Sequence, residues 1–153
     1  MIDRIPARPA LLGLVCGAVL ALPPAVLAGG EAFTRDAASP ELDWGPCPEF
    51  FPDGCAIAVL QGDPSGDNAD IFIRFPGNSE IPHHWHSSAE RMVLVAGELA
   101  VDYDGQDPVV MRPGTYAYGP ARLAHDAACR SNEDCVLFIA FVGPVDAIEG
   151  GPD

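Results

Sequence analysis

The sequence contains no lysine, and its positive charge is scarce. Eight arginines stand against 22 acidic residues, which gives a formal net charge of -14. Nucleic acids and anionic membranes bind clustered positive charge, so both classes of partner are disfavoured. A strongly acidic surface is sufficient to keep a protein soluble and needs no other explanation.

Helical periodicity is also missing. No segment repeats its apolar residues with the helical period of 3.6, and no internal repeat is visible. Sixteen glycines and sixteen prolines are spread along the chain, a pattern typical of many short strands. The length of 153 residues, 48% of them hydrophobic, suits one domain with a single core.

The first segment differs from the rest of the chain. Arg4 and Arg8 precede the apolar run LLGLVCGAVLAL, and the small-residue stretch PPAVLAGG follows. This order predicts a secretory signal peptide over residues 1–28, cleaved after Ala28. The apolar run is short for a membrane span and ends at two prolines, so an uncleaved anchor is the weaker alternative. We therefore expect an exported protein, periplasmic or secreted, without a stable membrane span.

Four of the five cysteines lie beyond this segment, because Cys16 falls within it. An even number of cysteines in an oxidising compartment predicts two disulfides, for which three connectivities are possible. Local pairing is favoured, since Cys47 and Cys55 bracket the loop PEFFPDG and Cys129 and Cys135 flank RSNED. Thiolate ligation of a metal is the weaker alternative, because neither spacing is a CxxC knuckle.

Strand signals begin after residue 50. Runs rich in Ile, Val, Leu and Phe are CAIAVLQG, ADIFIRF, MVLVAG, ELAVDY, PVVM and CVLFIAFV. Glycine, proline, aspartate or asparagine bounds each run, which predicts short strands. So many strands can bury both faces only in a sandwich or closed barrel, so we expect an all-β jelly-roll barrel. Residues 29–50 are expected to form a loop-rich N-terminal arm, residues 51–147 the barrel domain and residues 148–153 a C-terminal tail.

All four histidines lie between positions 83 and 125, and three of them fall in His83-His84-Trp85-His86. In an extended segment side chains two apart share a face, so His84 and His86 can present two imidazoles to one point. Glu90 follows four residues later and can bring a carboxylate beside them. His83 is expected at the surface or in a supporting position, and Trp85 in core packing.

The segment GNSEIPHHWHSSAERMVLVAG resembles the first cupin motif. That motif has a glycine, then HxH, then a glutamate three or four residues later, then a closing glycine. The matching residues are Gly77, His84, His86, Glu90 and Gly97. Six residues, rather than the usual five, separate the first glycine from the first histidine of the motif.

The segment GTYAYGPARLAHDAAC resembles the second cupin motif, a glycine, five residues and then PxGxxHxxxN. Gly114, Pro120 and His125 match it, while Arg122 replaces its glycine and Cys129 its asparagine. A joint match to both motifs is far more specific than either alone. The stretches LQGDPSG and FVGP also resemble segments of small single-domain bacterial cupins related to the quercetin-dioxygenase-like group, which is a weaker likeness.

The resemblance implies the cupin double-stranded β-helix and one divalent transition metal bound by His84, His86, Glu90 and His125. Three imidazoles and one carboxylate suit Fe, Mn, Ni, Cu or Zn better than Ca or Mg. Glu90 could also detach from the metal and act as the catalytic base. The resemblance further implies a small-molecule ligand or substrate and a homodimer.

Two classes of function stay open at this point. One is an oxygenase-like enzyme that acts on a small oxygenated organic substrate, and the other is a non-catalytic metal- or ligand-binding module. An isomerase or lyase is a less favoured third class. Export places the protein where Cu and Zn compete, so the order of metal affinities opposes Fe(II). One fold hosts many functions, so the likeness supports a metal site more firmly than a reaction.

Overall fold

The computed structural model describes residues 31–153, of which residues 34–153 form one compact unit. The predicted signal peptide, with its cleavage site and Cys16, lies outside the described residues. Residues 31–153 contain no helix, and hence none long and apolar enough to span a membrane. The strands of this region are β1 (Trp44–Pro46), β2 (Ala56–Gln61), β3 (Asp70–Phe75), β4 (Glu80–Trp85), β5 (Glu90–Ala96), β6 (Leu99–Tyr103), β7 (Val109–Met111), β8 (Tyr116–Gly119), β9 (His125–Cys129), β10 (Cys135–Phe141) and β11 (Ile148–Glu149).

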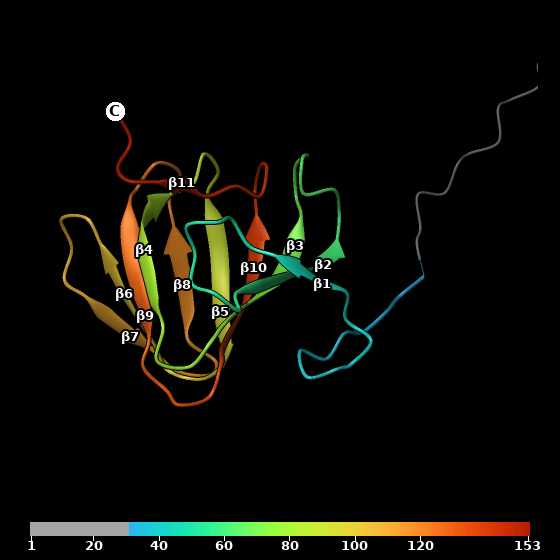
Figure 1. The fold of residues 1–153 in the computed structure, drawn as a ribbon. Coiled ribbons are helices and arrows are strands. Elements are labelled where there is room, and N and C mark those ends of the chain that lie inside the picture. Colours follow the sequence, from blue (N-terminus) through green and yellow to red (C-terminus); the bar gives the residue numbers. More distant parts are fainter. Residues whose placement is uncertain (1–30) are drawn as a thin grey trace, which may run out of the picture. The chain divides into compact units, whose positions relative to one another are not determined.

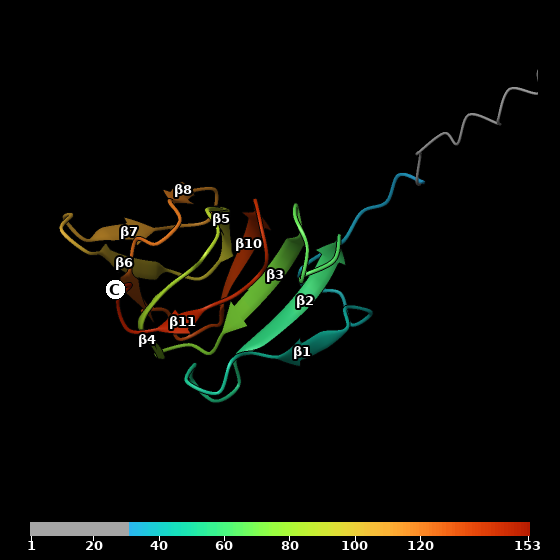
Figure 2. The ribbon, with the colours of Figure 1, turned by 90° about the horizontal axis from the view of Figure 1, so that it is seen from above.

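The strands form two antiparallel sheets that face one another (Figures 1 and 2). In the described part of the chain, one sheet has the order β1-β2-β3-β10-β5-β8 and the other the order β11-β4-β9-β6-β7. Several neighbours, such as β3 with β10 and β4 with β9, are far apart in the sequence. This architecture is the predicted all-β jelly roll.

The core lies between the two sheets and follows the alternation of the strands. Ile71 and Ile73 on β3 point inward, as do Leu137 and Ile139 on β10. Polar and charged side chains are rarely buried, so those inside this core need a reason. They are His84, His86, Ser88, Glu90 and His125.

Residues 34–50 of the predicted arm and the predicted tail belong to the compact unit. Within the arm, β1 pairs with β2, and Trp44 packs on the outer face of the sheet with Phe72 and Val136. The guanidinium of Arg74 lies 4.6 Å from the Trp44 ring centroid. In the tail, β11 pairs with β4. Both ends of the described chain therefore contribute strands to the sheets.

The six predicted runs correspond to β2, β3, β5, β6, β7 and β10. The remaining strands carry weak local signals, since β4 includes Pro82 and β9 reads HDAAC. They are strands because paired neighbours accept and donate their backbone hydrogen bonds, which tertiary structure supplies and intrinsic propensity does not.

Both cysteine pairs are joined locally, as predicted. Cys47 bonds to Cys55 and Cys129 bonds to Cys135. Two disulfides among residues 31–153 are compatible with an oxidising compartment.

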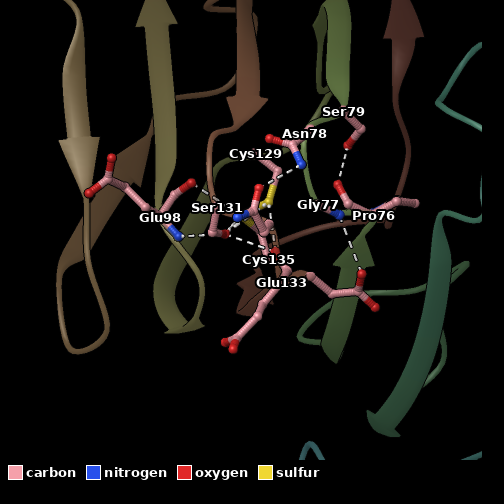
Figure 3. The surroundings of a disulfide bond; sticks show 11 residues. Pro76, Gly77, Asn78, Ser79, Glu98, Cys129, Ser131, Glu133 and Cys135 are labelled. Carbon is pink, nitrogen blue, oxygen red and sulfur yellow. Dashed lines mark hydrogen bonds between the residues drawn. A yellow bond between two sulfur atoms is a disulfide. The ribbon is translucent and has the colours of Figure 1, made fainter.

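The Cys129–Cys135 disulfide sits in a hydrogen-bonded network at one end of the barrel (Figure 3). It links the end of β9 to the start of β10, and Ser131 lies in the loop between them. The Ser131 hydroxyl accepts a hydrogen bond from the Glu98 amide (3.1 Å) and donates one to the Glu133 carbonyl (2.8 Å). The disulfide and the hydrogen bonds together tie the β9–β10 loop to the neighbouring strand ends.

Candidate metal centre

The structure brings the four predicted metal-binding side chains together inside the barrel. His84 lies on β4 and His86 just after it, while Glu90 begins β5 and His125 begins β9. Each of the four is between 2% and 8% exposed. Ring nitrogens of the three histidines lie within 4.8 Å of one another. The Glu90 carboxylate oxygens are 3.7 Å from Nε2 of His86 and 3.8 Å from Nε2 of His125.

A β-bulge in β4 aims its histidines inward. Ile81 pairs with Ala127 and His84 with His125, so β4 has one residue more than β9 between these pairs. The extra residue reverses the alternation, and the buried positions shift from Ile81 to His84 and His86. The bulge lies between Gly77 and His84, the segment that is one residue longer here than in the first cupin motif.

Backbone carbonyls fix the tautomer of all three histidines. In each ring Nδ1 is the nitrogen hydrogen-bonded to a carbonyl, so it must carry the proton and leave the Nε2 lone pair free. These bonds run from His84 to Pro82 (2.7 Å), from His125 to Leu123 (3.4 Å) and from His86 to Asp146. A histidine oriented in this way is prepared to bind a metal through Nε2.

Glu90 places a carboxylate beside the three imidazoles. Its Oε1 atom is buried without any hydrogen-bond partner, which costs free energy unless a cation or donor compensates it. Gly119 on β8 makes room for this carboxylate, because a Cβ at that position would lie 2.6 Å from Oε1. Metal–ligand bonds of about 2.1 Å place neighbouring donor atoms about 3.0–3.4 Å apart, slightly closer than these donors lie. The four residues therefore fit a divalent transition metal after a small inward movement.

Burial sets the protonation of the centre. Desolvation, together with the charge of neighbouring histidines, lowers the pKa of His84 to about 3 and that of His125 to about 4. Both imidazoles are therefore neutral near pH 7, the form that binds metals. Desolvation raises the pKa of Glu90, and His86 opposes this only in part. A bound cation would favour the carboxylate form instead.

A cavity of about 170 Å³ adjoins the four side chains. Its other lining residues are almost all aliphatic or aromatic. The apolar ones are Pro48, Phe51, Ile57, Ile71, Ile73, Phe75, Ile81, Met92, Leu99, Val101, Ala127, Leu137, Ile139, Phe141, Val145 and Ala147. Asp146 is the remaining polar residue of the lining.

Both the arm and the C-terminal segment border this cavity. The Phe51 ring lies 5.0 Å from the His84 ring. Asp146 supports His86 through its carbonyl, and its carboxylate accepts bonds from the amide (2.9 Å) and the hydroxyl of Ser87. Neither Gly119 nor Asp146 could be found from the sequence, since each acts through a position in space rather than through a motif.

Two neighbours of the histidine pair have roles outside the cavity. His83 is at the surface, as predicted, and its Nε2 lies 2.9 Å from Asp104 Oδ1. The prediction of core packing for Trp85 is wrong, because Trp85 faces away from the interior and is half-buried beneath Arg122 (4.8 Å). Arg122 has a positive φ of 65°, and its amide donates to the His86 carbonyl (2.9 Å). It thus adopts the conformation for which the cupin motif uses glycine.

Comparison with known families gives the same result as the motifs. Residues 71–141 match the cupin domain family, and this segment contains all four predicted metal-binding residues. Residues 71–141 thus form a cupin domain. A search of the curated proteins found no match for this cupin.

Solved structures with low sequence identity share the fold. An RmlC-like cupin from Shewanella frigidimarina has a TM-score of 0.58 and 21% identity over 76% of this chain and 93% of that one. The polyketide cyclase RemF from Streptomyces resistomycificus has a TM-score of 0.61 and 14% identity over 79% and 88%. The DMSP lyase DddQ from Ruegeria pomeroyi has a TM-score of 0.60 and 19% identity over 71% of this chain. This cupin covers only 60% of that lyase and 62% of a second DMSP lyase structure. Such identities show the fold alone.

Proposed function

We propose that this cupin is an exported protein that binds one divalent transition metal through His84, His86, Glu90 and His125 and acts as an oxygenase-like enzyme. The observation that carries the proposal is the shared tautomer of the three histidines, which leaves each Nε2 lone pair free, together with a buried Glu90 oxygen that has no hydrogen-bond partner. A buried arrangement of this kind is costly for a protein that has no cation to place there.

Three neutral imidazoles and one carboxylate leave a charge near +1 around a divalent metal and suit Fe, Mn, Ni, Cu or Zn. When bound, the metal would supply a Lewis acid with one or two coordination positions left for a small ligand. The chain itself would orient the ligand in the apolar cavity and exclude water, and Glu90 could accept a proton if it detached from the metal.

A non-catalytic metal- or ligand-binding cupin is the second candidate. The cavity favours it in one respect. Among residues 31–153, the only titratable lining residue outside the metal centre is Asp146, whose carboxylate is hydrogen-bonded to Ser87. A reaction in this cavity would therefore depend on the metal and Glu90 for every proton transfer.

Export is supported by the two disulfides and by the signal-peptide pattern of residues 1–28. It matters for the metal, because a protein that folds outside the cytoplasm meets Cu and Zn in competition with Fe(II). The homodimer that the cupin resemblance implies is supported by exposed Tyr116 and Tyr118 on edge strand β8.

Metal analysis of protein recovered from its exported compartment tests the proposal first. One equivalent of a transition metal is expected, and protein purified without any metal that also takes up none would contradict the proposal. Oxygen uptake with a β-diketone substrate would then support the oxygenase. Metal without turnover would support the binding module, and product formation without oxygen would support a lyase or isomerase.

The variant His84→Ala tests the ligand assignment. Loss of one of the three imidazoles should weaken metal binding by at least about 100-fold, measured by competition with a chromophoric chelator. The matched control is His83→Ala, which removes the adjacent surface histidine and should leave metal binding unchanged. Stoichiometric, tight metal in His84→Ala would refute the assignment.

A further inference from the structure

The cavity beside the metal centre combines a small size with a lining that has no cationic side chain. We infer that its ligand is a small, largely apolar molecule that binds the metal through one polar end and carries at most one negative charge. This inference rests on the proposed function, since it names the substrate class of the proposed metal centre.

The charges around the cavity restrict the charge of the ligand. Lysine is absent from the sequence, and no arginine among residues 31–153 lines the cavity. Arg74 and Arg112 form ion pairs at the surface, with Asp134 and Glu98, and Arg122 covers Trp85. A ligand with a remote carboxylate would find no cation to pair with. It would instead meet the buried carboxylate of Glu90 and the negative charge of the whole chain.

The metal centre sets the charge that the ligand can bring. A divalent metal with Glu90 leaves a charge near +1, which one negative charge on the ligand, such as an enolate, cancels. A dianion would leave a net negative charge in a cavity lined by Met92, Leu137 and Ile139. Burying an uncompensated charge among such side chains is unfavourable.

The volume of the cavity restricts the size of the ligand. The cavity of about 170 Å³ is close to the volume of about 150 Å³ at which an apolar cavity in a protein accepts benzene. One ring or a short chain therefore fills the cavity beside the metal, and a molecule with several fused or linked rings is too large to lie wholly within it.

The apolar walls define the body of the ligand. Phe51, Phe75 and Phe141 contribute aromatic surface, and the remaining walls are aliphatic. Beyond the metal centre, the polar lining residue is Asp146, whose carboxylate is already bonded to Ser87. Hydroxyl or amide groups placed on the body of the ligand would lack partners there.

A matched pair of chelators tests the inference on Zn(II)-loaded protein. Acetylacetone and malonate have the same number of non-hydrogen atoms and the same spacing between the chelating oxygens, but malonate is a dianion. Calorimetric titration should show acetylacetone binding at least about tenfold more tightly than malonate. Dibenzoylmethane, the same diketone with two phenyl groups, should bind at least about tenfold more weakly than acetylacetone.

Variants of the cavity lining test whether the ligand binds in the cavity. Ala127→Val adds volume to the lining and should weaken acetylacetone several-fold, whereas Ala140→Val, on the outward side of β10, should not. Zinc content and melting temperature of both variants verify that the metal centre and the fold persist.

The outcomes separate this inference from the proposed function. Failure of the wild-type protein to load Zn(II) would overturn the metal centre and the inference with it. Loaded protein that binds malonate or dibenzoylmethane as tightly as acetylacetone would overturn the inference alone. Equal weakening by Ala127→Val and Ala140→Val would overturn the placement of the ligand in the cavity.

Discussion

The two ends of the barrel share the same strands but differ in how their polar groups are satisfied. β4 and β9 pair along their lengths, from Glu80 with Ala128 at one end to His84 with His125 at the other. In Figure 1 the β9–β10 loop lies at the lower end and β11 at the upper end. At the lower end a disulfide and a hydrogen-bond network satisfy the loops. At the upper end histidines and a carboxylate are buried, and Glu90 Oε1 has no partner.

This difference shows how a small barrel can tolerate a costly site. Buried ionisable groups without partners destabilise the folded state until a ligand compensates them. The covalent link and the network at the far end restrict the unfolded chain and the loops, which offsets part of that cost. The Cys129–Cys135 disulfide and its network therefore lie at the opposite end of the barrel from the metal centre, and continuous strands connect the two.

Acid should lower the stability of the metal-free protein through the buried histidines of the site. The pKa values of His84 and His125 are lowered on folding to about 3 and about 4, so below their ordinary value of 6.5 the unfolded chain binds more protons. Stability is then lost as the pH falls. The raised pKa of Glu90 acts with the opposite sign and offsets part of this loss. Each of the two histidines contributes a loss of up to about 1.4 kcal/mol per pH unit between pH 6.5 and 4.5.

Urea denaturation in the presence of EDTA measures this loss at the two pH values. His125→Gln removes one of the two histidines and should flatten the dependence by about 1.4 kcal/mol per pH unit. An unchanged slope in this variant would show that groups outside the site control the acid sensitivity.

Removing each disulfide should separate stability from function. Loops closed over sequence separations of 6 and 8 residues stabilise a protein by about 2–3 kcal/mol in the chain-entropy account. We expect that loss in both double variants to serine. Only the Cys47–Cys55 variant should also weaken metal or ligand binding, because that loop carries Pro48 and Phe51, which line the cavity.

Urea denaturation and metal titration of the two double variants make this comparison. If replacing Cys129 and Cys135 altered the metal centre as much as replacing Cys47 and Cys55, the proposed separation between the two ends would be wrong.

A single methyl group should displace the carboxylate of the site. In Gly119→Ala the new Cβ would lie 2.6 Å from Glu90 Oε1, so the carboxylate must move away. We expect metal affinity to fall about 10- to 100-fold, or about 1.4–2.7 kcal/mol. The matched control is Gly45→Ala on β1, whose Cβ would be 3.8 Å from its nearest neighbour, the Ile57 carbonyl oxygen. Equal metal affinity in the two variants would argue against Glu90 as a ligand.

Much of the fold and the centre could be predicted because the relevant signals are local. Runs of β-branched and large apolar residues predict strands such as β3 and β10 wherever they occur. The spacing of His84 and His86 places both side chains on one face of an extended segment, whatever surrounds it. Likewise, the polar loops between the paired cysteines favour short disulfides. These inferences need only the few residues on either side.

Other features depend on partners that are distant in the sequence. β9 is a strand because β4 and β6 flank it, and Trp85 is at the outer face because the bulge in β4 fixes which side faces inward. The prediction of core packing for Trp85 was wrong because the sequence alone does not tell what covers each face of the strand.

The sequence by itself determined that this protein is an acidic all-β cupin with two local disulfides and a clustered set of possible metal-binding residues. Only the tertiary structure decided that the His84, His86 and His125 rings share one tautomer, that Gly119 leaves space for Glu90, and that the cavity is small and without cations. The physical reason is the range of the interactions. Strand propensity and side-chain alternation act over neighbouring residues, whereas carbonyl contacts, cavity volume and burial arise only when distant segments pack together.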